Sequence, residues 1–470
     1  MSEMRWEWMV PCGECGECKG RVLCEPARKK LRRYSGIRPT SDGFDCALPV
    51  SIDSHSVCSY GCYYCFSDNL VQHRIGREQD IGQTPLREIE KLFSGEGKRY
   101  ETLRRALKYD RRNAAGYPTA VQLGAICDPC DNIERNQGWL LKFIELAIKY
   151  NQPVRMSTKG RIFQSKEYQA AIAQAPHLFW VAFSIISPDD ELLEQIDRRA
   201  PNATQRLETM KILSGLGVKT SLRFRPMLPG LSDRTPRYPE AYRVLIEKAA
   251  EAGAVAVSYE VVFVPGTMTK DLKWRWGEIE RITKVPFKQL YKQFGPTQAC
   301  MRPPYTWTEN IMHAVAEVSH RNGMVVGVSD PCWKQLTDSG CCCGIMPDDP
   351  VFGNWQTESA TNQLLIAKTT GKILGPEDII PEWAYKQGMP GMINLGPGPQ
   401  SAWGKSHIHW SDRLRRVWNG MEKQRSPLNY FQGALMPDHV DERGDVFYRY
   451  EGLKRQYLGQ TPYWSVPPRV

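Results

Sequence analysis

The fold is decided by the stretch Cys58-Ser59-Tyr60-Gly61-Cys62-Tyr63-Tyr64-Cys65, which follows the apolar run Leu48-Pro49-Val50-Ser51-Ile52. The apolar run is typical of a buried strand, and the three cysteines that follow it share one short loop. Three thiolates can hold three irons of a four-iron four-sulfur cluster, whereas the usual all-cysteine site has four. One iron would therefore keep an open position, and an open metal position is typical of sites that do chemistry, as is best known for zinc.

Two alternative interpretations of these cysteines are a zinc knuckle and three cysteines that pack together by chance. Zinc sites usually show two separated pairs of ligands, whereas this is a single trio with an aromatic residue, Tyr64, before its last cysteine. The stretch resembles the signature of the radical S-adenosylmethionine (SAM) enzymes. The resemblance implies that Cys58, Cys62 and Cys65 hold a 4Fe-4S cluster whose open iron chelates the amino and carboxylate groups of SAM. An electron from the cluster would then split SAM into methionine and a 5′-deoxyadenosyl radical.

Composition bounds the class of protein. The chain has 470 residues, of which 41% are hydrophobic, enough for one large core with extensions or for two to three domains. Residues 1–7 lack the apolar core of a signal peptide, so we interpret the 15 cysteines as metal ligands in a reducing cytoplasm. No apolar run approaches the ~20 residues that cross a bilayer, so no membrane partner is expected. The net charge of +10 favours a polyanionic partner such as nucleic acid.

Residues 1–45 form a cysteine-rich extension. Cys12, Cys15, Cys18 and Cys24 lie close together with small residues between them, and they could bind a zinc ion or a second iron–sulfur cluster. The basic segment 28–33 follows. It is either a solvated helix face or a nucleic-acid contact.

Strand-like and helix-like segments alternate from residue 46 onward, which predicts a parallel sheet with helices outside it. We predict six strands, over residues 48–53, 120–126, 154–157, 179–185, 219–224 and 254–264. Predicted helices around 207–216 and 242–252 end at Gly217 and Gly253, and a strand follows each glycine directly. The fold class is therefore α/β, a partial or complete TIM-like (β/α) barrel over residues 46–290, with a less regular carboxyl-terminal region over 291–470. Active sites of such barrels lie at the carboxyl ends of the strands, and the cysteine trio lies just past the first strand.

Residues 120–230 resemble one branch of the superfamily, the spore photoproduct lyase-like proteins, often labelled DNA repair photolyases. Five segments carry the resemblance, which covers about half the chain: 124–134, 156–159, 183–185, 197–207 and 225–230. It implies that Tyr64 packs against adenine and that Ser157, Lys159 and Ser184 line the SAM pocket, together with Gly124 and Asp128 of the first segment. Lys159 could neutralise the SAM carboxylate. Arg223 is a further candidate for anion binding, because a guanidinium grips a carboxylate at two points.

Cys127 and Cys130 are the candidate catalytic thiols. In the lyase, a cysteine at the end of the second strand returns a hydrogen atom to the product radical; aligned on Asp128, that position is Ala125 here. Alternate strand residues point the same way, so Cys127 could present its thiol there if the strand continued. Buried inert cysteine is the alternative. This departure predicts a related reaction rather than the lyase reaction itself.

The carboxyl-terminal region holds five more cysteines, which could bind an auxiliary iron–sulfur cluster or zinc. They are Cys300, Cys332, Cys341, Cys342 and Cys343. Residues 401–470 mix aromatic and basic side chains, which either stack on unpaired bases along a phosphate backbone or pack a tail against the barrel.

The sequence thus predicts a cytoplasmic radical SAM enzyme that abstracts hydrogen from a nucleic acid base, in repair or modification. It would receive its electron from a reductant such as flavodoxin or ferredoxin. A peptide or protein maturase with an auxiliary cluster is the second hypothesis. A metal-stabilised binding module without catalysis is the third.

Overall fold

The protein is described by a computed structural model that covers residues 32–39, 48, 50–65, 82–96, 112–262, 264–265, 270–287, 300–353, 359–379, 415–420, 426–431 and 433–452. The four amino-terminal cysteines and the mixed aromatic and basic segment 401–414 lie outside the described residues, as does all but the end of the basic segment 28–33. Their predicted roles stay predictions.

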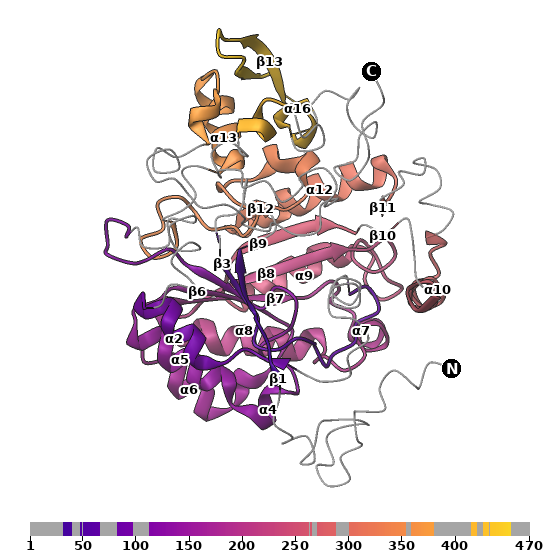
Figure 1. Ribbon diagram of the computed structural model, residues 1–470. Helices are drawn as coiled ribbons and strands as arrows, with labels where there is room; N and C mark the ends of the chain where they lie inside the picture. Colours follow the sequence, from indigo (N-terminus) through magenta and orange to yellow (C-terminus); the bar gives the residue numbers. More distant parts are fainter. Residues whose placement is uncertain are drawn as a thin grey trace.

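An eight-stranded sheet forms the centre of the molecule (Figure 1). Its strands lie in the order β12-β9-β8-β7-β6-β5-β3-β2, and every neighbouring pair is parallel except β2 and β3. The strands are β2 (Ile37–Pro39), β3 (Val50–Ile52), β5 (Val121–Leu123), β6 (Val154–Thr158), β7 (Phe179–Ser184), β8 (Lys219–Met227), β9 (Ala254–Val261) and β12 (Val325–Val328). The architecture is an open version of the TIM-like barrel that the sequence predicts.

Helices alternate with the strands and cover one face of the sheet (Figure 1). They are α2 (Leu86–Ser94), α5 (Trp139–Lys149), α6 (Lys166–Ile172), α7 (Asp190–Asp197), α8 (Ala203–Gly215), α9 (Ala241–Glu251) and α12 (Tyr305–Arg321). Two further helices lie elsewhere: α10 (Lys270–Thr283) lies against α7, and α13 (Ala360–Thr370) lies beside the hairpin of residues 435–450. Apolar strand residues such as Met156, Phe183 and Val257 pack with helix residues such as Phe143 and Leu213 in one buried core. Removing this apolar surface from water supplies the main driving force for the fold.

The six strands predicted from the sequence are confirmed, with ends that differ by a few residues. Helices α8 and α9 end where predicted, because Gly217 and Gly253 adopt positive φ angles of 84° and 89°. Glycine enters this left-handed conformation without the steric cost of a Cβ. Two further strands, β2 and β12, extend the sheet beyond the predicted limits of 46 and 290 on either side.

The opposite face of the sheet is lined by small and polar residues. Strand residues alternate between the two faces, and the register places Ser157, Ser184, Arg223 and Ser258 on the same side. Part of this face is covered by residues 341–353: Cys341, Cys343, Ile345 and Phe352 pack against Ala120, Trp180 and Ala256 near the amino ends of the strands. A segment from late in the sequence therefore closes one end of the inner face, and the carboxyl ends of the strands stay at the other.

Shorter elements complete the described structure. They are β1 (Arg32–Arg33), β4 (Gly82–Gln83), α4 (Glu134–Gln137), β10 (Val264–Pro265), β11 (Cys300–Met301), α16 (Pro427–Tyr430), β13 (Leu435–Val440), β14 (Val446–Tyr450) and the 3₁₀ turns η3 (Ile162–Gln164), η4 (Pro176–Leu178), η5 (Pro331–Leu336) and η7 (Pro376–Asp378). β13 and β14 form an antiparallel hairpin. Among the helices of the described ranges, none has the length and apolar character to cross a membrane.

Candidate active site

The cysteine loop begins six residues after β3, at the carboxyl edge of the sheet. Two carboxylates hold it and the neighbouring loop in place. Asp53 is fully buried directly after β3, and its Oδ1 accepts hydrogen bonds from the backbone N–H groups of Ala125, Ile126 and Cys127 at 2.9, 2.7 and 3.3 Å. Such charge-assisted bonds are stronger than neutral ones. The loop after β5 is therefore fastened to the start of the cysteine segment.

Asp131 makes the second connection between these loops. Its Oδ2 accepts a hydrogen bond from the Ser59 N–H at 2.7 Å, and the Tyr60 hydroxyl donates to the Cys130 carbonyl oxygen at 2.9 Å. Burial, opposed by the Ser59 N–H and reinforced by the negative charge of Asp128, raises the pKa of Asp131 to about 7. The residue next to Cys58 is thus held by a carboxyl group 72 positions away in the sequence.

Asp128 fastens the loop after β5 to the end of β6. It accepts hydrogen bonds from the Thr158 hydroxyl at 2.6 Å, from the Cys130 N–H at 2.9 Å and from the Lys159 N–H at 2.6 Å. Burial raises its pKa, and the Thr158 and Lys159 donors oppose that rise. Asp128 therefore positions the backbone of Lys159 and, through it, the direction of the lysine side chain.

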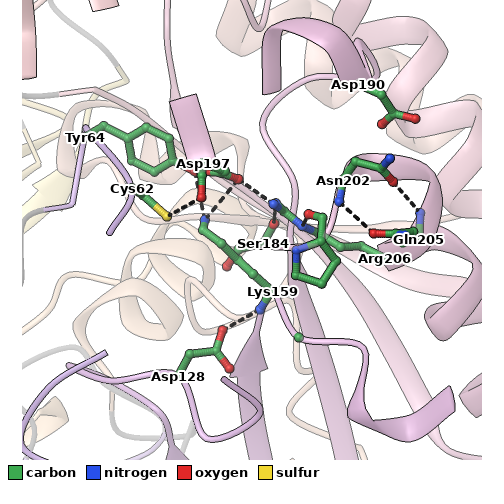
Figure 2. A network of polar contacts seen from close by, with 12 residues as sticks. Cys62, Tyr64, Asp128, Lys159, Ser184, Asp190, Asp197, Asn202, Gln205 and Arg206 are labelled. Atoms are coloured by element: carbon green, nitrogen blue, oxygen red, sulfur yellow. Dashed lines mark hydrogen bonds and ion pairs between the residues drawn. The ribbon is translucent and has the colours of Figure 1, made fainter. Parts of the chain in front are cut away.

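Lys159, Tyr64, Asp197 and Arg206 form one polar network, which Figure 2 shows. Asp197 and Arg206 are buried, and Lys159 and Tyr64 are partly buried. The Lys159 Nζ donates to the Tyr64 hydroxyl at 2.8 Å and lies 3.9 Å from Asp197 Oδ2, while Tyr64 in turn donates to Asp197. Burial alone would raise the pKa of Asp197, but the positive charges of Lys159 and Arg206 outweigh it and hold the pKa below its usual value. The carboxylate is therefore ionised and joins α7 to the cysteine loop.

The three thiols of the loop form no disulfide and lie near one another. Cys62 is buried, and Cys58 and Cys65 are partly buried. Burial raises the pKa values of Cys58 and Cys62. The charge of Cys62 also raises the pKa of Cys58, and the charge of Cys65 also raises that of Cys62. Since iron binds the thiolate form, cluster assembly must displace these protons.

This donor set fits a 4Fe-4S cluster with one open iron. Across the described ranges, no group of three or more His, Cys, Asp or Glu side chains is arranged around a single metal ion. The assignment of Cys58, Cys62 and Cys65 as the ligands of such a cluster stays a prediction.

Cys127 and Cys130 lie in the same region but make different contacts. The Cys127 Sγ lies 3.4 Å from the Ser54 hydroxyl, and the Cys130 Sγ lies 3.6 Å from the Met156 sulfur. Both side chains are buried, and burial raises both thiol pKa values. Their thiols are therefore protonated, which is the form that can donate a hydrogen atom.

The other predicted cofactor residues lie at neighbouring strand ends. The Ser157 hydroxyl accepts hydrogen bonds from Gln122 and Arg155, both at 3.1 Å, and the Ser184 hydroxyl accepts one from Arg223 at 3.3 Å. Gly124 has a positive φ of 79°, and a Cβ on it would come within 2.8 Å of the Ser157 carbonyl oxygen. Glycine is thus required where the chain leaves β5.

The predicted auxiliary cysteines lie in three different parts of the structure. Cys341, Cys342 and Cys343 belong to the segment that covers the inner face, where the Cys342 carbonyl oxygen accepts a hydrogen bond from Ser258 at 2.6 Å. Cys300 lies in β11 and Cys332 in η5, but their side chains lie outside the described residues. An auxiliary metal site stays a prediction.

Several residues of this region were not among the candidates predicted from the sequence: Asp53, Asp131, Asp197, Arg206, Arg155, Arg225 and Glu260. Asp131, Asp197 and Arg206 belong to segments that carry the family resemblance. Alternation along β6 and β8 was the signal that could have placed Arg155 and Arg225 with Arg223 on the polar face.

Residues 54–238 match the model of the radical SAM superfamily. This part of the chain is therefore similar to a radical SAM domain. A 4Fe-4S cluster and SAM are the cofactors that this superfamily implies.

Among curated proteins, the chain is similar to uncharacterized proteins of Mycobacterium bovis and Mycobacterium tuberculosis. Each is 22% identical over 242 residues, which is 50% of this chain and 63% of the relative. The chain thus spans less than two thirds of the length of the curated relatives it matches.

Among solved structures, the chain is similar to a mutant of spore photoproduct lyase and to that lyase complexed with dinucleoside spore photoproduct. The TM-scores are 0.45 and 0.42 and the identities 15% and 16%; each match covers 63% of this chain and 79% of the other. It is also similar to Streptococcus suis SuiB bound to precursor peptide SuiA, with a TM-score of 0.31 and 13% identity over 47% of this chain and 41% of that one.

Proposed function

We propose that this radical SAM enzyme abstracts hydrogen from a nucleic acid base, in repair or modification. The observation that carries the catalytic part is the loop with Cys58, Cys62 and Cys65, which Asp131 and Asp197 hold at the carboxyl edge of the sheet. The substrate class is supported by the net charge of +10, since phosphate contacts supply much of the affinity of nucleic-acid-binding proteins.

The residues around the loop have separate tasks in this proposal. When bound, the cluster and SAM supply the electron and the radical that removes hydrogen. Lys159 would neutralise the SAM carboxylate, and its Nζ is held nearby by Tyr64 and Asp197. Ser184 would form a hydrogen bond with the ribose or the amino group of SAM. Cys127, with its protonated thiol, would return a hydrogen atom to the product.

Formation of 5′-deoxyadenosine tests the catalytic part. Anaerobic, cluster-loaded protein with SAM and dithionite is expected to form it, and Cys62→Ala is expected to lose both iron and product. Cys46→Ala is a matched control, because Cys46 is a cysteine of the same region that carries none of the predicted roles. Iron-loaded protein that forms no 5′-deoxyadenosine would overturn the enzyme assignment in favour of a binding module.

Salt-dependent binding tests the substrate class. Binding of a single-stranded oligonucleotide should weaken steeply as salt rises, because phosphate contacts release counterions. Oligonucleotide binding that is absent or indifferent to salt would contradict the nucleic-acid substrate. It would leave peptide maturation as the alternative for the same radical chemistry.

A further inference from the structure

Three arginines meet on the polar inner face of the sheet. Arg155 comes from β6, and Arg223 and Arg225 come from β8. Arg155 is 1% exposed, and the Arg225 side chain is 10% exposed. They lie on the side of the sheet away from the helices, because Arg223 pairs in register with Ser258, whose hydroxyl contacts the covering segment at Cys342.

Several donors of these arginines have no hydrogen-bond partner although they are buried. They are the Nε and Nη2 of Arg155, the Nε of Arg223 and the Nε of Arg225. The Nη1 of Arg155 donates to Gln122 at 2.8 Å and to Ser157, so this guanidinium is held in place while the donors on its Nε and Nη2 stay open. A buried guanidinium N–H without an acceptor costs more than a neutral one.

The negative charge nearby does not balance the three guanidiniums. Glu260 on β9 lies 3.9 Å from Arg225 and also acts on Arg223. Burial and, after it, the positive charges of Arg225 and Arg155 together lower the pKa of Arg223 to about 9, so the three guanidiniums are close enough to act on one another. Buried charges are normally paired, because leaving them uncompensated costs several kcal/mol.

The arginine cluster, which is Arg155, Arg223 and Arg225, adjoins the network around Asp197. Ser184 links the two: its hydroxyl accepts a hydrogen bond from Arg223 at 3.3 Å, and its carbonyl oxygen accepts one from Arg206 at 2.7 Å. A group bound by the cluster would therefore lie on the inner face of the sheet, next to the residues assigned to SAM.

We propose that the arginine cluster binds a phosphate group of the substrate. Three guanidiniums and one carboxylate leave two positive charges, which match a phosphate monoester better than a carboxylate, and the planar donors suit its oxygens. This inference rests on the proposed function for the reacting site, and it reassigns Arg223 from the cofactor to the substrate. Ser157 and Gln122 orient Arg155 for this task.

Calorimetric titration of the anaerobic, cluster-loaded protein with inorganic phosphate at constant ionic strength tests the proposal. Arg155→Gln and Arg225→Gln are expected to weaken phosphate binding at least about ten-fold, which corresponds to one lost charge-assisted hydrogen bond. Arg281→Gln is the control, because Arg281 is 60% exposed and pairs with Glu278 away from the cluster. Methyl phosphate and dimethyl phosphate then distinguish a terminal phosphate from a backbone diester.

A stability measurement guards against variants that merely unfold. Phosphate should raise the melting temperature of the native protein and of Arg281→Gln, because a ligand that binds only the folded state stabilises it. In phosphate-free buffer, Arg155→Gln should melt no lower than the native protein, since it removes one of three buried like charges, and phosphate should no longer raise its melting temperature.

Three results would overturn the proposal. They are phosphate binding that Arg155→Gln leaves unchanged, acetate binding as tightly as phosphate, and displacement of phosphate by SAM. The last would assign the cluster to the SAM carboxylate. Formation of 5′-deoxyadenosine in the same samples, without substrate, tests the proposed function separately. A failure of the proposed function can therefore be distinguished from a failure of the phosphate-binding proposal.

Discussion

Arg206 on α8 donates a hydrogen bond of 2.6 Å to Asp197 at the end of α7, and both side chains are almost completely buried, at 0% and 1% exposure. The same carboxylate receives the Tyr64 hydroxyl and lies beside Lys159. One ionised carboxylate thus joins a helix, the cysteine loop and the lysine assigned to SAM. Its two cationic partners would both lose their counter-charge if it were neutralised.

The change Asp197→Asn is therefore expected to lower the free energy of unfolding by about 3–5 kcal/mol, because it leaves the buried Arg206 and the partly buried Lys159 without a carboxylate. Urea denaturation under anaerobic conditions measures this. Glu191→Gln on the same helix is the control, because Glu191 is exposed and should change stability by about 0.5 kcal/mol or less. Equal losses for both variants would show that the polar network does not stabilise the fold.

Lys159→Met is expected to weaken SAM binding about ten-fold or more, since the variant removes the cation assigned to the SAM carboxylate. Equilibrium dialysis with cluster-loaded protein measures the affinity, and iron content checks that the cluster is retained. Lys166→Met is the control, because Lys166 is exposed at the start of α6. Unchanged SAM affinity in Lys159→Met would restrict Lys159 to its contacts with Tyr64 and Asp197.

Glu134 is expected to make stability fall as pH rises. Burial raises its pKa to about 7, while the Tyr168 hydroxyl and the Leu140 N–H, which donate to Oε1, oppose this. Below the unfolded-state pKa both states are protonated. Between that value and about 7 only the folded state keeps the proton, so stability is lost across this range and stays low above it.

Glu134→Gln should remove this pH dependence, which amounts to roughly 3 kcal/mol at about 1.4 kcal/mol per pKa unit. Free energies of unfolding of both proteins at pH values of about 5 and about 8 give the comparison. The free energy of unfolding of the variant should rise relative to that of the native protein at the higher pH. A constant difference between the two proteins at both pH values would contradict the raised pKa.

Gly124→Ala separates backbone strain from steric conflict. Both Gly124 and Gly116 have positive φ angles, 79° and 86°, but a Cβ on Gly124 would approach the Pro129 ring to 2.7 Å and the Ser157 carbonyl oxygen to 2.8 Å, whereas one on Gly116 would meet nothing within 4 Å. Gly116→Ala should cost about 1 kcal/mol from φ alone. Gly124→Ala should cost clearly more and should also reduce SAM binding, as urea denaturation and dialysis would reveal. Similar losses of stability for the two variants would mean that the turn after β5 accommodates a Cβ at little cost.

The strands and the cysteine loop could be predicted because their signals are local. Apolar runs such as 154–157 and 179–185 bounded by polar turns predicted β6 and β7, and the spacing of Cys58, Cys62 and Cys65 indicated a shared metal cluster with an open position. The glycines at 217 and 253 marked helix ends for a reason contained in one residue, the absence of a Cβ.

The connections between distant segments could not be read in this way. Asp131 holds Ser59 across 72 positions, and the segment around Cys341–Cys343 covers the inner face of strands that precede it by more than 80 residues. The partner of a buried carboxylate depends on the order of the strands in the sheet and on the positions of the loops. Neither can be predicted from the spacing of a few neighbouring residues.

The sequence by itself determined the alternation of strands and helices and the three thiols on one loop, since period, turn residues and ligand spacing act over a few neighbouring positions. Tertiary structure alone decided that Asp197 would serve Tyr64, Lys159 and Arg206 together, and that Arg155 would lie beside Arg223 and Arg225. The physical reason is that burial and the parallel register bring these charges together, and a charge acquires its role only from the groups that surround it once water is excluded.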